Sequence, residues 1–142
     1  MNDCVFCRII SGELLGSFVF KNALVSVFMD LHPVNTGHVL IVPNTHFSRF
    51  TMISPNIVEE MFKVAQNILK SIEDSDIICE GANLFLSDGE VAGQEVPHSH
   101  LHITPRFQND GHKMGFSHFD SKLSNRELLD STAEKIKQYF KG

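Results

Sequence analysis

Three histidines stand at alternate positions of one short segment, and no other part of the sequence has more capacity for chemistry. His98, His100 and His102 are separated by Ser99 and Leu101. Successive side chains of a β-strand point to opposite faces, so the three imidazoles would share one face, each about 6–7 Å from the next. A row of imidazoles at this spacing can flank a phosphate group or bind a metal ion. We predict an extended strand here.

The middle histidine of the row is the candidate nucleophile. A neutral imidazole nitrogen is nucleophilic near pH 7 when its tautomer is fixed. Attack on an α-phosphate would form a phosphoramidate, which water then cleaves, and the phosphate oxygens need hydrogen-bond donors during this reaction. His100 has a neighbouring imidazole on each side. The spacing therefore predicts His100 as the nucleophile and His102 as a phosphate donor.

Two other interpretations of the row stay open on spacing alone. Three imidazoles with an open water position form a known hydrolytic zinc site, which His98, His100 and His102 would then build together. The three side chains would otherwise be exposed or hydrogen-bonded residues without a chemical role.

The residues around the row extend the pattern. Gly93-Gln94 precedes the histidines and Thr104-Pro105-Arg106 follows them. With other matching pieces, over about residues 4–107, the chain resembles the histidine-triad (HIT) superfamily of nucleotide hydrolases and transferases. The resemblance is to zinc-bearing, bacterial-type HIT hydrolases that are similar to dinucleoside polyphosphate hydrolases. Ser99 and Thr104 depart from the family pattern, which normally has hydrophobic residues at these positions.

The resemblance implies an enzyme that cleaves at the α-phosphate of dinucleoside polyphosphates or nucleoside phosphoramidates. The reaction would pass through a covalent nucleotidyl intermediate on His100, and no organic cofactor is implied. A purine nucleotide would be the substrate, and the family usually forms homodimers. The alternative is a regulatory module that binds nucleotides in the same pocket and turns them over slowly.

The resemblance also implies roles for residues outside the histidine row. Gln94 would contact the bridging oxygen or leaving group as a catalytic residue. Asp30 would accept hydrogen bonds from the ribose hydroxyls, although an Asp before Pro33 also suits a turn. Ser87 replaces an Asn found near the phosphate in many relatives. The implied substrate-binding residues are Asp30, Ser87, Gly93, Gln94, Glu95 and His102.

A Cys-x-x-Cys pair near the N-terminus is the candidate metal site. Cys4 and Cys7 supply half of a tetrahedral set, and the sequence has no second such pair. The resemblance to zinc-bearing HIT proteins, and to the related galactose-1-phosphate uridylyltransferases, implies His46 and His98 as the other ligands. The zinc ion would be structural. Two buried thiols without a metal, or a redox pair, are the alternatives.

The composition favours a soluble cytoplasmic protein. The 142 residues carry a net charge of −5 and include three cysteines, an odd count that does not fit a disulfide scaffold. No apolar run reaches the length needed to span a membrane, and the N-terminus lacks a signal-peptide pattern. Without a dense basic run, nucleic acid is not an expected partner, and this disfavours a small zinc-dependent nucleic-acid binder.

The order of predicted elements gives the fold class. Strands are expected at 17–20, 24–29, 38–42 and 83–87 and at the histidine row, with a long helix over about 54–73 and a C-terminal helix. Ser54 and a Ser124–Glu127 capping box would begin the two helices. This order predicts an α+β fold with a mainly antiparallel sheet. The resemblance implies five strands with the long helix packed on them, within a single domain (1–142) whose segment 108–142 is a loop and helix.

Overall fold

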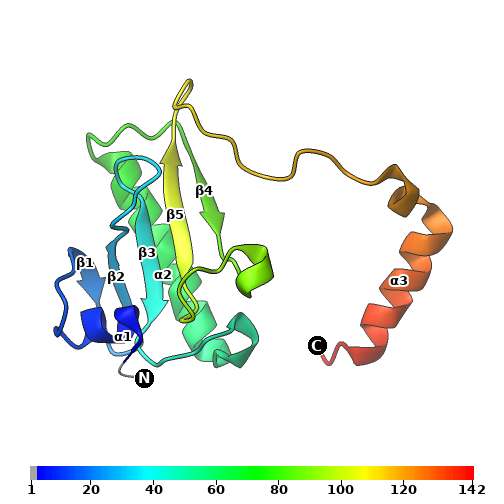
Figure 1. Ribbon diagram of the computed structural model, residues 1–142, viewed down its shortest axis with the longest axis horizontal. Helices are drawn as coiled ribbons and strands as arrows, with labels where there is room; N and C mark the ends of the chain where they lie inside the picture. Colours follow the sequence, from blue (N-terminus) through cyan, green and yellow to red (C-terminus); the bar gives the residue numbers. More distant parts are fainter. Residues whose placement is uncertain (1–2) are drawn as a thin grey trace. The chain divides into compact units, whose positions relative to one another are not determined.

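The computed structural model describes residues 3–142 and groups them into two compact units, 3–111 and 112–142. The first unit carries all five strands (Figure 1). Its elements are α1 (Val5–Ile10), β1 (Phe18–Lys21), β2 (Val25–Met29), β3 (Val39–Pro43), the 3-10 turn η1 (Phe50–Met52), α2 (Pro55–Asp74), β4 (Gly81–Phe85), η2 (Glu90–Ala92) and β5 (Leu101–Arg106). The second unit holds η3 (Ser121–Ser124) and α3 (Arg126–Tyr139).

The five strands form one antiparallel sheet in the order β1-β2-β3-β5-β4. The predicted α+β class and five-stranded sheet are therefore confirmed. Strand β5 lies between β3 and β4, so the end of the histidine row is held by a strand on each side. The register places Phe28, Leu40, His102 and Phe85 side by side across four strands, on one face of the sheet.

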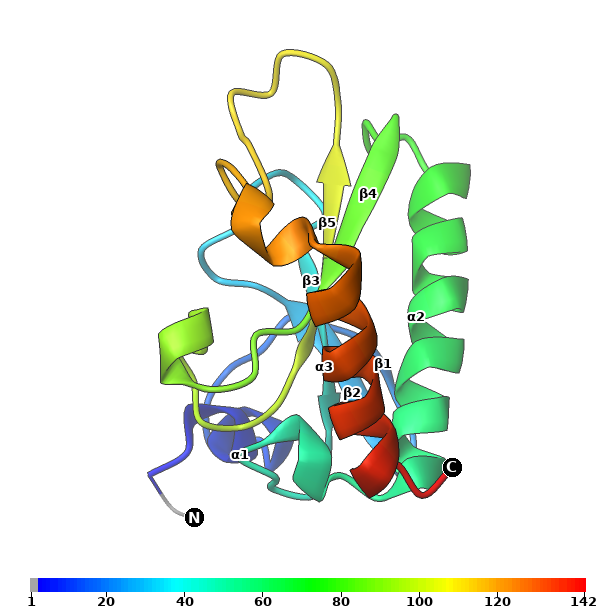
Figure 2. The same ribbon diagram turned by 90° about the vertical axis from the view of Figure 1, so that its right-hand side faces the viewer.

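Helix α2 covers the opposite face (Figure 2). Its apolar residues recur at helical spacing and pack on the alternate residues of β2, β3 and β5. Met61 lies at the centre of this layer and is fully buried. The buried residues are Val25, Val27, Val39, Ile41, Ile53, Ile57, Met61, Val64, Ala65, Ile68, Ile72, Leu101 and Ile103. This layer makes the sheet a rigid support for the groups on its other face.

Helix α1 packs on the face that carries the histidines. Phe6 and Ile9 are buried against Phe28, Leu40 and Val42. A helix of six residues is too short to be stable alone. Its packing on the sheet therefore helps to hold it in place. This short helix is capped by the Cys4 thiol, which accepts a hydrogen bond from the Cys7 N–H.

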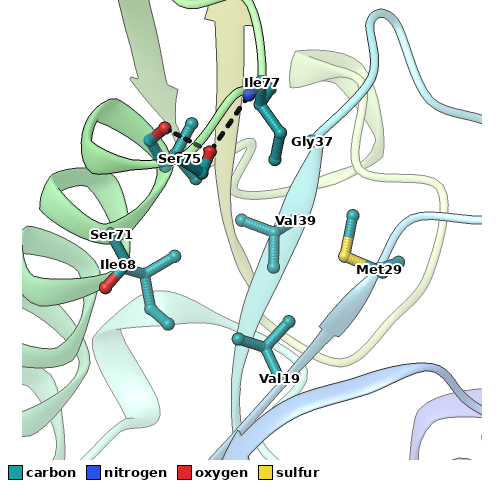
Figure 3. A pocket seen from close by; sticks show the side chains of 9 residues that line it. Val19, Met29, Gly37, Val39, Ile68, Ser71, Ser75 and Ile77 are labelled. Atoms are coloured by element: carbon teal, nitrogen blue, oxygen red, sulfur yellow. Dashed lines mark hydrogen bonds between the residues drawn. The ribbon is translucent and has the colours of Figure 1, made fainter.

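An apolar hollow of about 180 Å³ opens between α2 and the strands on its side of the sheet (Figure 3). Its polar groups are already used, because the Ser71 hydroxyl donates to Asn67 O and the Ser75 hydroxyl to Ile72 O. The hollow lies on the face away from the histidines. It is lined by Val19, Met29, Gly37, Val39, Ile68, Ser71, Ile72, Ser75 and Ile77.

Several predicted boundaries differ from the structure. Strand β5 begins only at Leu101, because the loop before it has its own hydrogen bonds: the His98 N–H donates to Val96 O and the Ser99 N–H to Phe47 O. Ser54 precedes α2 as predicted, but its side chain makes no capping hydrogen bond. Strand β4 spans Gly81–Phe85, so it begins and ends two residues earlier than the predicted range 83–87.

The second unit consists of an irregular segment and two helical elements. Asn125, rather than Ser124, caps α3 by accepting a hydrogen bond from the Leu128 N–H. Every residue from 112 to 142 is exposed. The unit begins close to residue 108, where the predicted C-terminal loop and helix start. Within residues 3–142, no helix is both long enough and apolar enough to cross a membrane.

Candidate active site and metal centre

The structure fixes the tautomer of His100. Its Nδ1 lies 2.7 Å from the backbone oxygen of His98, and a carbonyl oxygen can only accept. Nδ1 therefore carries the proton, which leaves a lone pair on Nε2. Burial lowers the pKa of His100, so the ring is neutral near pH 7. A neutral, oriented imidazole with a free Nε2 lone pair is the state required of a nucleophile.

His102 lies beside His100, with ring centroids 4.8 Å apart. The ring of Phe85 stacks on His102 at 4.2 Å, almost parallel, and holds its plane. Burial, and then the neighbouring His100, lower the pKa of His102 to about 4. This ring is thus also neutral near pH 7, and it donates a hydrogen bond to substrate only if the nitrogen facing substrate carries the proton.

The side chains of Asp30 and His38 lie next to the His102 ring. Asp30 Oδ2 lies 3.4 Å from His38 Nε2 and 3.9 Å from His102 Nδ1. The other carboxylate oxygen accepts a hydrogen bond from the His32 N–H. His38 Nε2 and His102 Nδ1 are 2.9 Å apart, and these three groups together are near enough to hold a metal ion. Asp30 is brought to the histidine row, while its contact with a ribose stays a prediction.

The side chain of Gln94 is engaged with backbone groups. Its Oε1 accepts from the Gly89 N–H, and its Nε2 donates to Ser48 O and Val96 O. The Gly93 N–H donates to Glu90 O. These bonds link the loop after β3 to the loop that precedes the row. The predicted contact of Gln94 and Gly93 with phosphate would require some of these bonds to be exchanged, and it stays a prediction.

Ser87 and Glu95 lie at the same loop. A Cβ placed on Gly93 would be 3.8 Å from the Ser87 hydroxyl, and Gly93 has a φ of +95° that disfavours any other residue. The exposed carboxylate of Glu95 is close enough to His100 to act against the lowering of its pKa. Both predicted residues thus lie around the row, and their contacts with substrate stay predictions.

The four predicted metal ligands converge. The candidate ligand atoms of Cys4, Cys7, His46 and His98 all lie within 4.8 Å of one another. Three sulfur–nitrogen distances are 3.3 Å (Cys4 Sγ to His98 Nδ1), 3.5 Å (Cys7 Sγ to His46 Nδ1) and 3.6 Å (Cys7 Sγ to His98 Nδ1). Tetrahedral zinc with its usual bond lengths separates sulfur and nitrogen ligands by about 3.6 Å. The donor set fits zinc.

The tautomer of His98 also suits a zinc ligand. Its Nε2 lies 2.8 Å from Pro43 O and must donate to it, so the lone pair is on Nδ1, which faces both thiols. Burial lowers the pKa of His98 to about 4 and keeps it neutral, as a metal ligand must be. His98 faces these thiols while His100 does not share them, so the alternative of one zinc bound by the three row histidines is not favoured.

A known family accounts for this arrangement. The family model named HIT domain matches residues 11–109. The chain belongs to the HIT family. An uncharacterized HIT-like protein of Borreliella burgdorferi is 38% identical over 97% of this chain and 94% of its own length. The crystal structure of a HIT family protein from Bacillus anthracis covers 99% of both chains at 31% identity, with a TM-score of 0.91.

Three further HIT proteins have informative names. The adenosine 5'-monophosphoramidase HNT1 of Candida albicans is 28% identical over 96% of this chain and 90% of its own. The adenylylsulfatase HINT3 of Arabidopsis thaliana is 33% identical over 77% of this chain, which spans only 55% of that protein. A Zn-bound histidine triad family protein from Mycobacterium smegmatis matches 98% of this chain and 99% of its own, with 29% identity and a TM-score of 0.74.

Sequence reasoning missed part of this HIT site. Phe85 was expected in a strand but without a role, although a residue paired with His102 across two strands must share its face. The role of His38 was not predicted.

Proposed function

We propose that this HIT-family protein is a nucleotide hydrolase or nucleotidyl transferase that acts at an α-phosphate. Dinucleoside polyphosphates and nucleoside phosphoramidates are the proposed substrates, with a purine nucleoside in the pocket. The observation that carries the proposal is the 2.7 Å contact of His100 Nδ1 with His98 O, because it leaves the nucleophilic lone pair on Nε2. The prediction of an enzyme agrees with the names of two relatives, an adenylylsulfatase and an adenosine 5'-monophosphoramidase.

The proposed reaction has two displacements. In the first, the Nε2 lone pair of His100 attacks phosphorus, a nitrogen–phosphorus bond forms, and the bond to the leaving oxygen or nitrogen breaks. In the second, water attacks phosphorus and loses a proton to solvent, the nitrogen–phosphorus bond breaks, the nucleoside monophosphate is released, and the electron pair of that bond returns to Nε2. As positive charge develops on His100, its bonded His98 carbonyl and the Glu95 carboxylate stabilise it. Asp30 would bind the ribose, while Gln94, Gly93, Ser87 and His102 would surround the phosphate.

A structural zinc ion belongs to the proposal. Cys4, Cys7, His46 and His98 would hold it, and it would supply a fixed link between α1, the loop after β3 and the start of the histidine row. Because the His98 carbonyl orients His100, fixing the His98 ring also fixes the nucleophile. Thiolates that bind zinc persist in a reducing compartment, so a cytoplasmic location is proposed as well.

We also propose that two copies form the active assembly. Strand β4 pairs only with β5 among the described strands, so one edge of the sheet is available. Leu84 on this strand is an exposed apolar residue. A two-fold pairing of this edge would cover it.

The function is tested by hydrolysis of adenosine 5'-monophosphoramidate and diadenosine tetraphosphate. Wild type and a His118→Gln control, changed at an exposed histidine, should cleave at least one of them. His100→Gln should reduce kcat by at least about 10⁴-fold while the complex with AMP still forms, since the nucleophile is removed without emptying the pocket. Equal turnover by wild type and His100→Gln would refute the proposal. Binding without turnover by wild type would favour the regulatory module.

A further inference from the structure

We propose that His38 is a positioning residue that fixes the proton of His102 on Nε2, the ring nitrogen that does not face His38. The catalytic consequence rests on the proposed function, whereas the tautomer itself can be observed without any turnover. The inference comes from one chain of hydrogen bonds that begins at a backbone N–H and ends at His102.

The first link of the chain fixes His38. This side chain is buried, and the Val34 N–H donates to its Nδ1 over 3.0 Å. A backbone N–H can only donate, so Nδ1 must carry the lone pair. In a neutral imidazole the proton then lies on Nε2. The backbone of His38 is itself held at both groups, because its N–H donates to Asn35 O and its carbonyl accepts from the Asp30 N–H.

The second link transfers this constraint to His102. The proton on His38 Nε2 points to two acceptors, His102 Nδ1 at 2.9 Å and Asp30 Oδ2 at 3.4 Å, and the shorter contact is the better hydrogen bond. His102 Nδ1 must therefore carry a lone pair, and its proton lies on Nε2. The opposite tautomer of His102 would place two N–H groups against each other, either at His38 Nε2 or at Val34.

The two neighbouring histidines thus have opposite tautomers. His100 keeps its proton on Nδ1 and offers a lone pair from Nε2, while His102 keeps its lone pair on Nδ1 and offers an N–H from Nε2. One ring can attack phosphorus and the next can donate to a phosphate oxygen or to the leaving group. Without His38, nothing among these bonds would decide which nitrogen of His102 carries the proton.

The same bonds argue against a metal ion at Asp30, His38 and His102. The point equidistant from their three atoms lies about 2.0 Å from each, which equals a zinc bond length. Distance alone would therefore allow a metal. A metal ion on His38 Nε2 would need the lone pair there, and this would move the proton to Nδ1, against the Val34 N–H. The group is a chain of proton donors and acceptors.

Nitrogen-15 NMR of protein with labelled histidine tests the tautomer directly. The His102 signals are assigned by their loss in His102→Gln. The expected result near pH 7 is a protonated Nε2 and an unprotonated Nδ1 on His102, with the reverse on His100. A protonated His102 Nδ1 in the wild-type protein would overturn the proposal whether or not the protein turns over any nucleotide, so this result is independent of the proposed function.

Two substitutions separate positioning from structural support. The His38→Asn side chain can still accept from Val34 but is too short to donate to His102, whereas His38→Gln can reach His102 with its amide N–H. His38→Asn should mix the two His102 tautomers and lower kcat by about 10–100-fold with KM within about twofold. His38→Gln should restore the wild-type tautomer and most of kcat.

A double-mutant cycle closes the test. In a His102→Gln background, His38→Asn should cause no further loss of kcat, because it acts only through the replaced ring. Equal losses of kcat in both backgrounds would show a general structural role and overturn the proposal. If His38→Asn does not fold, His38→Gln and the wild-type spectrum still decide the question.

Discussion

Substitution of one zinc ligand should lower the free energy of unfolding, because it should release helix α1 from the sheet and expose the residues that α1 buries. Cys7→Ser removes a ligand whose Sγ lies 3.5 Å from His46 Nδ1 and 3.6 Å from His98 Nδ1. Helix α1 has six residues and cannot persist once its link to the sheet is lost. Phe6 and Ile9 would then become exposed, at about 1.5–3 kcal/mol each. The expected loss is about 3–6 kcal/mol, and the α2 layer should stay folded.

This loss should appear as a fall of about 10–20 °C in Tm for a chain of 142 residues. Elemental analysis gives the zinc content, and circular dichroism gives the Tm. Wild type and the matched control Cys79→Ser, whose thiol lies outside the cluster, should each bind one zinc ion per chain. Cys7→Ser should bind little zinc. Equal zinc content and Tm in all three proteins would refute the metal centre.

Three other predictions follow from burial and from the sheet edge. The folded-state pKa of His102 is about 4, below its unfolded value near 6.5, so stability should fall as pH drops from about 6.5 towards 4; urea unfolding of wild type against His102→Gln should show a smaller pH dependence in the variant. Met61→Ala should cost about 2–5 kcal/mol in urea unfolding, while the exposed Met52→Ala should cost under about 0.5 kcal/mol, and equal costs would contradict the α2 layer. Leu84→Lys should convert the proposed dimer to monomer in light scattering, whereas the exposed Val91→Lys should not; two monomeric or two dimeric variants would exclude the β4 edge.

The fold was predictable because each layer repeats a simple pattern. The apolar residues of α2 recur at helical spacing, and β3 is nearly all apolar, so both elements were predicted at nearly their observed positions. Boundaries were less predictable where loop bonds compete with regular structure. His98 and Ser99 donate their N–H groups to Val96 O and Phe47 O, and no pattern in the sequence reveals these partners.

The residues proposed for the candidate site could mostly be named from the sequence, but their hydrogen bonds could not. The four metal ligands and the nucleophile were named from spacing and resemblance, and the structure brings the four ligands together. The tautomers of His98 and His102 depend on contacts with distant segments, with Pro43 O and with His38, 55 and 64 residues away. Such contacts follow from the register of β3 on β5, which the nearly all-apolar sequence of β3 does not determine.

The central claim is that the free Nε2 of His100 attacks phosphorus, and mass spectrometry of protein quenched during turnover tests it most directly. With labelled diadenosine tetraphosphate as substrate, the account predicts a nucleotidyl group attached to the protein and located on His100 by fragmentation. A nucleotidyl group on another residue, or rapid turnover with no adduct at any quench time, would contradict it and indicate direct attack by water.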